Sequence, residues 1–74
     1  MQITVSLHGV FRIERFKLEI RAYPADSPVQ KVIDELKIPV KLLGIIIING
    51  VHATATDILH DGDTLMLLPL LEGG

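Results

Sequence analysis

The sequence ends with Asp61-Gly-Asp-Thr-Leu-Met-Leu-Leu-Pro-Leu-Leu-Glu-Gly-Gly74, which reads as a turn, an apolar strand and a short tail. The strand is apolar on both of its faces, and this favours a central place in a sheet. Pro69 cannot donate a ladder hydrogen bond, so strand pairing is expected to fail there and release the chain. The stretch therefore predicts a buried central strand followed by a flexible C-terminal tail over residues 70–74.

The tail carries the residues that point to chemistry, which are Leu70, Leu71, Glu72, Gly73 and Gly74. Extended from Pro69, it reaches at most about 20 Å, long enough to enter a pocket of another protein. The two glycines lack a Cβ, so they can pass a narrow channel and leave the carbonyl carbon of Gly74 open to attack. The alternative interpretation is a frayed end, since chain termini are commonly disordered.

Length and composition limit the class of protein. The 74 residues predict a single domain over 1–74, which buries only about 60% of its unfolded surface. The chain has no cysteine, which suits a reducing compartment, and it shows no signal-peptide pattern, so we expect a cytoplasmic protein. The net charge of -2 and the pI of about 5.8 argue against nucleic acid as a partner. The run of isoleucines over 45–48 is far too short to span a membrane.

Alternation of apolar and polar residues predicts two strands, over residues 2–7 and 16–21, that pair as a hairpin. The side chains expected to face the core are Ile3, Val5 and Leu7 in the first strand and Phe16, Leu18 and Ile20 in the second. Phe11 and Ile13 have the opposite parity to Phe16, so a turn or bulge is expected near Glu14 and Arg15.

A helix is expected to start at Ser27, with Ser27 as N-cap, Pro28 at the first helical position and Gln30 three residues after the cap. Its apolar stripe consists of Val29, Val32, Ile33 and Leu36. The dipeptide Ile38-Pro39 is expected to end it.

The second half of the chain predicts three more elements before the final strand. Residues 44–49 contain four consecutive isoleucines, which predicts a strand that is apolar on both faces. Asn49-Gly50 indicates a tight turn into a short strand over 51–53. Residues 56–60 are expected to form one helical turn, with Ile58 and Leu59 in the core.

These elements predict an α+β fold in which one helix packs across a mixed sheet of four to five strands. The final strand is expected to insert between the first and third strands, with Leu65 and Leu67 facing the helix. The outer face of the sheet would then present an apolar patch directly behind the tail, formed by Ile45, Ile47, Met66 and Leu68. We expect this patch to bind a partner protein.

The sequence offers no catalytic machinery. It lacks a P-loop and a dinucleotide-binding loop, so we expect no bound cofactor. We also expect no metal site, because His8, His52 and His60 share no helix face and have no cysteine companions. Ser27 is better explained as a helix cap than as a nucleophile. An α-carboxylate is ionised at neutral pH, with a pKa of about 3.3 to 3.7, and must acquire a leaving group before its acyl carbon reacts. We therefore expect a substrate carried between enzymes rather than an enzyme.

The order of elements resembles the ubiquitin-like β-grasp fold. Asn49-Gly50, the run Leu-His-Asp-Gly-Asp over 59–63, and the ending Pro-Leu-Leu-Glu-Gly-Gly over 69–74 resemble the sulfur carriers of thiamine and molybdopterin synthesis, the ThiS and MoaD groups. The resemblance implies that a partner enzyme related to ubiquitin activators uses ATP to adenylate the carboxylate of Gly74. It further implies conversion to a thiocarboxylate and delivery to a sulfur-accepting synthase, either thiazole synthase or the large subunit of molybdopterin synthase.

The pathway stays open at this point. Pro69 resembles the proline at that place in the molybdopterin-synthase small subunit, whereas the Ile48-Asn49-Gly50 turn and the short length fit the thiamine carrier better. Two other classes of function are also open. One is a protein modifier that is joined through Gly74 to lysines of its targets. The other is a non-covalent β-grasp interaction module in which the isoleucine patch binds and the tail is idle.

Overall fold

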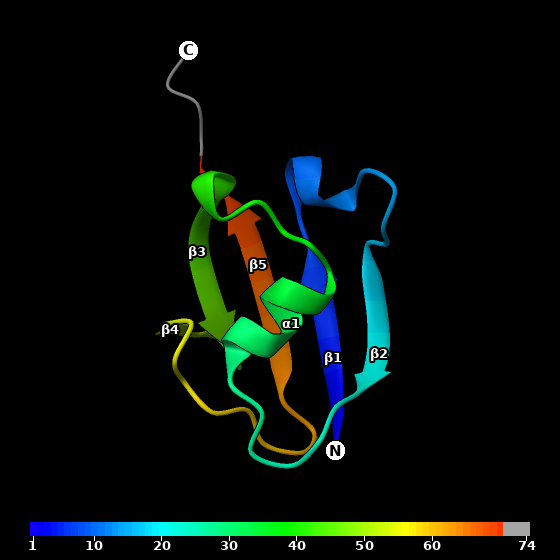
Figure 1. Cartoon of the computed structure of the whole chain (residues 1–74), viewed down its shortest axis with the longest axis vertical. Coiled ribbons are helices and arrows are strands. Elements are labelled where there is room, and N and C mark those ends of the chain that lie inside the picture. The colour runs from blue at the N-terminus through cyan, green and yellow to red at the C-terminus, as the bar shows by residue number, and fades with distance from the viewer. Residues whose placement is uncertain (71–74) are drawn as a thin grey trace.

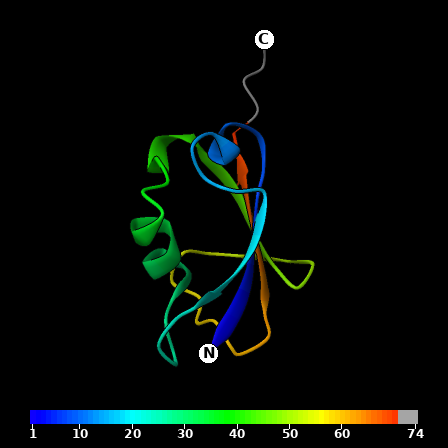
Figure 2. The same ribbon diagram turned by 90° about the vertical axis from the view of Figure 1, so that its right-hand side faces the viewer.

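The computed structural model describes residues 1–70, and the predictions made for residues 71–74 lie outside that range. One helix lies across one face of a five-stranded sheet (Figure 1, Figure 2). The elements are β1 (Gln2–Leu7), the 3-10 helix η1 (Gly9–Arg12), β2 (Leu18–Ala22), α1 (Val29–Glu35), the 3-10 helix η2 (Val40–Leu42), β3 (Leu43–Ile48), β4 (Val51–Ala53) and β5 (Thr64–Pro69). In the part of the chain that is described, no helix is long and apolar enough to cross a membrane.

The strand order is β2-β1-β5-β3-β4, so the last strand of the chain occupies the centre of the sheet (Figure 1). β5 runs parallel to β1 and antiparallel to β3, while β1–β2 and β3–β4 are antiparallel pairs. The parallel pair requires a long crossover, which the segment containing α1 provides. The predicted α+β class, the mixed sheet and the insertion of the final strand between the first and third are all confirmed.

The core lies between α1 and the inner face of the sheet. Its members are Ile3, Val5, Leu7, Phe11, Tyr23, Val29, Val32, Ile33, Ile38, Leu59, Leu65 and Leu67. The predicted parity of β1 and β5 is confirmed, because Ile3, Val5, Leu7, Leu65 and Leu67 are each fully buried. Three of the four predicted helix-stripe residues are also buried, and Leu36 packs at the edge of this cluster.

The start of the helix differs from the prediction. Pro28 is the N-cap and makes no side-chain capping bond, while the Ser27 hydroxyl donates to the carbonyl oxygen of Pro24 at 2.7 Å. The amides of Val29 and Gln30 instead donate to backbone carbonyls of the 54–58 loop, each at 2.9 Å. Ser27 is therefore not the cap, because a neighbouring loop supplies acceptors that the local sequence does not reveal.

The end of the helix is held by a residue from a distant loop. Lys37 adopts a positive φ of 55°, and the amide of Ile38 donates to the carbonyl of Ile33 at 3.0 Å, as in a Schellman motif. The Arg15 guanidinium donates to the carbonyl oxygens of Leu36 and Lys37, both at 2.9 Å. Arg15 thus fastens the β1–β2 connection to the helix, and the turn predicted near Glu14 and Arg15 is confirmed.

The prediction for the second strand had the wrong parity. Glu19 lies opposite Val5 and Arg21 opposite Ile3, so these charged residues share the helix-side face. Leu18 and Ile20 point the other way, and their exposed fractions are 62% and 66%. The prediction also included Phe16 and Lys17, whereas β2 begins at Leu18. Phe16 itself is half-buried and packs against the core, as predicted.

The physical reason for this parity lies in the position of β2 at the edge of the sheet, where charged residues that point inward discourage pairing with another chain. Arg21 lies over the ring of Phe16, 5.4 Å from its centroid, and forms ion pairs with Glu19 at 2.6 Å and Glu35 at 3.1 Å. Tyr23, which has the same parity as Arg21, is the residue of this segment that is buried in the core.

Residues 56–60 do not form the predicted helical turn. Ile58 is 43% exposed and forms an isolated bridge with Pro28, whereas Leu59 is buried as predicted. A tight turn closes where the Asp57 amide donates to the Thr54 carbonyl at 3.1 Å. Residues 57–59 then pair with the start of α1 instead of forming a helix, and the Leu59 amide donates to the Ser27 carbonyl at 2.9 Å.

The Tyr23 hydroxyl gives the fold a measurable dependence on alkaline pH. Burial, reinforced by the hydrogen bond that this hydroxyl donates to Glu35 at 2.9 Å, raises the pKa of Tyr23 from 10.0 to about 12. A folded pKa above the unfolded one means that the contribution to stability is complete below pH 10 and is lost as pH rises through about 12.

We therefore expect the free energy of unfolding to fall between pH 10 and about 12, and Tyr23→Phe to remove part of that slope. The chain has a single tyrosine, so phenolate absorbance reports this group alone. A pKa of 10.0 for Tyr23 in the folded protein, the ordinary value for tyrosine, would contradict a buried hydroxyl bonded to Glu35.

Candidate functional site

The predicted apolar patch is assembled on the outer face of the sheet. Ile45 lies directly opposite Leu68, and Ile47 lies directly opposite Met66, so the four side chains share one face of the β3–β5 pair. Ile45 is 40% exposed and the other three are half-buried. We call these four residues the outer patch. Their placement together agrees with the sequence analysis, while their role in binding stays a prediction.

Apolar surface continues beyond the outer patch through residues that sequence reasoning had assigned to the core. Ser6 lies between Met66 on β5 and Leu18 on β2, and Ile20 follows on the same face. The signal that would have placed Leu18 and Ile20 correctly is Tyr23, the large apolar residue that shares the parity of Glu19 and Arg21.

The outer face carries no Lys, Arg, Asp or Glu at any strand position of the described chain. Its residues are Gln2, Thr4, Ser6, Leu18, Ile20, Ala22, Ile45, Ile47, His52, Thr64, Met66 and Leu68. The helix covers the opposite face only (Figure 2). An exposed sheet face with apolar residues and no formal charge is typical of a surface that another protein covers.

The chain leaves the sheet at the edge of the outer patch. Pro69 pairs with Leu43, and the amide of Leu70 still donates to the carbonyl oxygen of Leu42 at 2.6 Å. The prediction that strand pairing fails at Pro69 was therefore wrong. The backbone amide of Leu70, the next residue, supplies the hydrogen-bond donor that proline lacks. Leu70 is 56% exposed. The other predicted tail residues, Leu71, Glu72, Gly73 and Gly74, lie outside the described residues.

The motif residues near Asn49 and Asp63 hold two turns together. The Asp63 carboxylate accepts from the backbone amide of His60 and from the Asn49 side-chain amide, both at 2.8 Å. The Asn49 side-chain oxygen accepts from the Thr64 amide at 2.9 Å. Asp63 is 9% exposed, and its hydrogen bonds give it a structural role within the run Leu59–Asp63. This arrangement sets the point at which β5 begins.

The titratable residues elsewhere in the described chain form no metal site. Among residues 1–70, no group of three or more His, Cys, Asp or Glu side chains could hold a metal ion. The His8 ring forms a hydrogen bond with the Ser6 hydroxyl at 3.1 Å. His52 and His60 are exposed and line one open depression together with Asp57 and Asp63, and the Nδ1 atom of His60 lies 3.8 Å from the Asp63 carboxylate.

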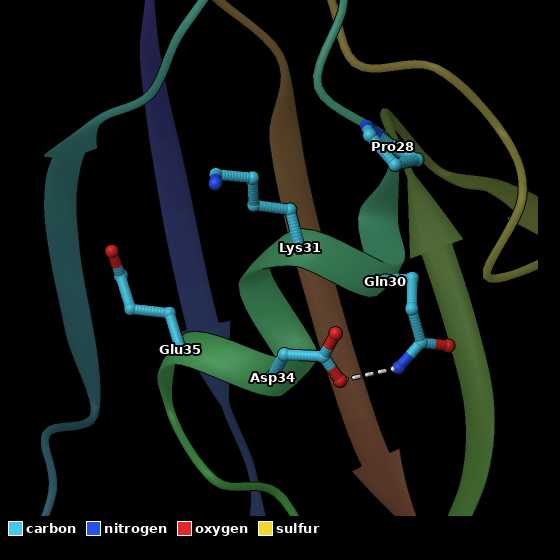
Figure 3. Close-up of a pocket in the computed structure, with 5 residues that line it drawn as sticks. All are labelled: Pro28, Gln30, Lys31, Asp34 and Glu35. Atoms are coloured by element: carbon cyan, nitrogen blue, oxygen red, sulfur yellow. Dashed lines mark hydrogen bonds between the residues drawn. The ribbon is translucent and has the colours of Figure 1, made fainter.

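An open depression on the outer side of α1 is lined by Pro28, Gln30, Lys31, Asp34 and Glu35 (Figure 3). There Gln30 donates to Asp34 at 2.7 Å, and Lys31 and Glu35 point away from that pair. This is the solvated side of the helix, and its polar groups do not converge on a common point.

Comparison with known proteins gives matches in structure but not in sequence. No family model matches the sequence, and no curated protein matches it. The structure is similar to SAMP1 from Haloferax volcanii, with a TM-score of 0.80, 18% identity and complete coverage of both chains. It is also similar to a putative molybdopterin converting factor subunit 1 from Pyrococcus furiosus, with a TM-score of 0.78, 21% identity, and coverage of 96% of this chain and 99% of that one.

A further match is a chain of the complex between subunits 1 and 2 of the molybdopterin-converting factor from Helicobacter pylori. Its TM-score is 0.67 at 22% identity, with complete coverage of both chains. At these identities the likeness concerns the fold. The five-stranded mixed sheet, the single crossing helix and these neighbours together show that the chain has the ubiquitin-like β-grasp fold anticipated from its resemblance to the ThiS and MoaD groups.

Proposed function

We propose that this chain is a sulfur carrier that works in the cytoplasm. In this proposal a partner enzyme of the ubiquitin-activating type uses ATP to adenylate the carboxylate of Gly74. The acyl adenylate is converted to a thiocarboxylate, and a synthase then takes the sulfur for thiamine or molybdopterin cofactor synthesis. The chain itself is the substrate of both enzymes and binds no cofactor.

One observation carries the proposal: the chain leaves the sheet next to an uncharged, partly exposed apolar face. Leu68 of the outer patch is followed at once by Pro69, which pairs with Leu43 of β3, and by Leu70, whose amide donates to the carbonyl oxygen of Leu42 at the end of η2. An enzyme that docks on this face would thus lie beside Leu70, the residue that precedes the predicted reactive end of the chain. The names of the structural neighbours also support a sulfur carrier, since one is a putative molybdopterin converting factor subunit and another comes from a complex of such subunits.

The chemistry divides between the carrier and its partners. The carrier contributes an unhindered glycine acyl group and a docking surface. The partner must contribute ATP binding and the activation of the carboxylate, because an ionised carboxylate is unreactive toward a sulfur nucleophile. Adenylation makes the acyl carbon electrophilic, and departure of AMP allows the sulfur to be attached.

We expect Ile47→Asp and Leu68→Asp each to weaken binding to the adenylating enzyme at least about tenfold, or about 1.4 kcal/mol, because each places an unpaired carboxylate within an apolar contact. The partner can be recovered from the native cell with the unmodified carrier as bait, and affinities are then measured with the purified pair.

The matched control is Val51→Asp, the same kind of change at a 67% exposed strand residue that lies opposite Ile48, on the helix-side face. This variant is expected to bind normally. Equal weakening by Val51→Asp would contradict docking on the outer face, and unfolding of the Ile47 or Leu68 variant would show that these side chains belong to the core.

The pathway is tested in the native cell. Deletion of the gene is expected to impose either a requirement for thiamine or a loss of molybdenum-enzyme activity, and re-expression of the intact chain is expected to correct it. A deletion strain that keeps both functions would contradict both versions of the proposal.

A further inference from the structure

Two glycines from different elements border the place where the chain leaves the sheet. The first is Gly44, which has no cross-strand partner, because the register shifts between the pairs Leu43–Pro69 and Ile45–Leu68. A Cβ added at Gly44 would lie 2.9 Å from the backbone nitrogen of Leu70 and 3.0 Å from its Cα. A glycine inside a strand often marks the close approach of another backbone, and here that backbone is the departing chain.

The second is Gly9, at the start of η1 and on the other side of β5. It has a positive φ of 57°, and a Cβ added to it would lie 2.9 Å from the Cγ atom of Pro69. Pro69 and Leu70 therefore pass between Gly9 on one side and Gly44 on the other. The Leu70 amide, bonded to the Leu42 carbonyl at 2.6 Å, completes the arrangement.

We infer that Gly9 and Gly44 are positioning residues, which hold Pro69 and Leu70 in one place and so set where the C-terminal segment leaves the domain relative to the outer patch. The inference concerns a consequence of the proposed function: a partner docked on the outer patch finds the acyl terminus only if the chain leaves in a defined direction. A Cβ at either position would have its nearest contacts with Pro69 and Leu70, and not with a residue of the outer patch.

The two contacts differ in how they can be relieved. At Gly44 the opposing atoms are backbone, so Pro69 and Leu70 themselves must move. At Gly9 the opposing atoms belong to the Pro69 ring, and shortening that side chain makes room. The inference therefore predicts that Pro69→Ala relieves Gly9→Ala and leaves Gly44→Ala unrelieved.

Hydrogen exchange of the isolated protein tests the geometry. In Gly44→Ala we expect the Leu70 amide to exchange about tenfold faster, as the loss of one backbone hydrogen bond allows. The amides of Leu65 and Leu67, in the middle of β5, are expected to keep their protection. Unchanged exchange at Leu70, or an equal gain at all three amides, would overturn the inference.

A double-mutant comparison tests the second contact, with Gly62→Ala as its control. Gly62 also has a positive φ, of 87°, but a Cβ added there meets nothing within 4 Å, so the control isolates the backbone cost. We expect Gly9→Ala, but not Gly62→Ala, to speed exchange at Leu70, and Gly9→Ala combined with Pro69→Ala to restore the exchange rate of Pro69→Ala alone. Identical exchange at Leu70 in the Gly9 and Gly62 variants would refute the contact.

The functional consequence is tested in a clarified lysate of the native cell supplied with ATP and a sulfur source, by following thiocarboxylate formation against carrier concentration. For Gly44→Ala we expect the maximal rate to fall about tenfold while the half-saturating concentration stays unchanged, because the outer patch is intact. If Gly44→Ala only impaired folding, the loss of activity would match the fraction of the variant that is unfolded. A normal rate would overturn the inference. If the unmodified protein is not thiocarboxylated, the proposed function fails, while hydrogen exchange still decides the role of the glycines.

Discussion

Deletion of Gly73 and Gly74 is expected to abolish the cellular function of this chain and leave its fold intact. Under the proposed function, Gly74 supplies the only acyl group that the partner enzymes modify, so its loss removes the reaction rather than slowing it. The core of the described residues, from Ile3 to Leu67, keeps all of its members in this variant, and the melting temperature should therefore change little. The measurements are complementation of the gene deletion and thermal unfolding of the purified variant.

The same deletion separates the competing functions. A non-covalent interaction module would keep its function, because its binding surface is the outer patch. A protein modifier would lose it, as a sulfur carrier would, but the intact chain would then be recovered in amide linkage to lysines of other proteins. Full complementation by the truncated chain would contradict both the carrier and the modifier.

Leu67→Ala is expected to destabilise the protein by about 2 to 5 kcal/mol, as truncation of a buried leucine does. Leu67 is fully buried on β5, the central strand, where it lies between Leu7 and Ile46. Such a loss is a large share of the total stability of a 74-residue domain. Chemical denaturation at equilibrium gives the value.

The control for this change is Met66→Ala, one residue earlier on the same strand. Met66 is half-buried on the outer face, so its truncation should cost clearly less than that of Leu67. Val32→Ala on α1 removes a smaller buried side chain and is expected to lie between the two. A larger loss for Met66→Ala than for Leu67→Ala would reverse the inner and outer faces of β5.

The fold was predictable because the strongest signals are periodic. Alternation in residues 2–7 and the run of 64–69 place β1 and β5, and hydrophobicity on both faces of β5 predicts its central position. The helical stripe around Val32 and Ile33 predicts α1. These patterns arise because the helix and the sheet bury their apolar faces against each other, and the spacing of apolar residues records which faces are buried.

The errors arose where long-range contacts decided the local structure. The parity of β2 depends on Arg21 packing over Phe16 and pairing with Glu35 on the helix, a contact that alternation does not encode. The start of α1 is capped by carbonyls of the 54–58 loop rather than by Ser27. Arg15 binds the far end of the helix from a loop about twenty residues away.

The candidate site was predicted in part. The outer patch follows from the parity of β3 and β5, both of which are apolar on their two faces. Its extension through Leu18 and Ile20 was missed with the parity of β2. The close approach of Gly44 to Leu70 was missed as well, because only the three-dimensional register brings the two backbones together.

The most direct test of the account is the intact mass of the protein purified from its native cell under conditions that preserve thioacids. The sulfur-carrier proposal predicts a species that ends at Gly74 with one carboxylate oxygen replaced by sulfur, and predicts that this species disappears when the adenylating enzyme is removed. A chain that carries only an unmodified carboxylate under every growth condition, or one that continues beyond Gly74 without being processed, would contradict it.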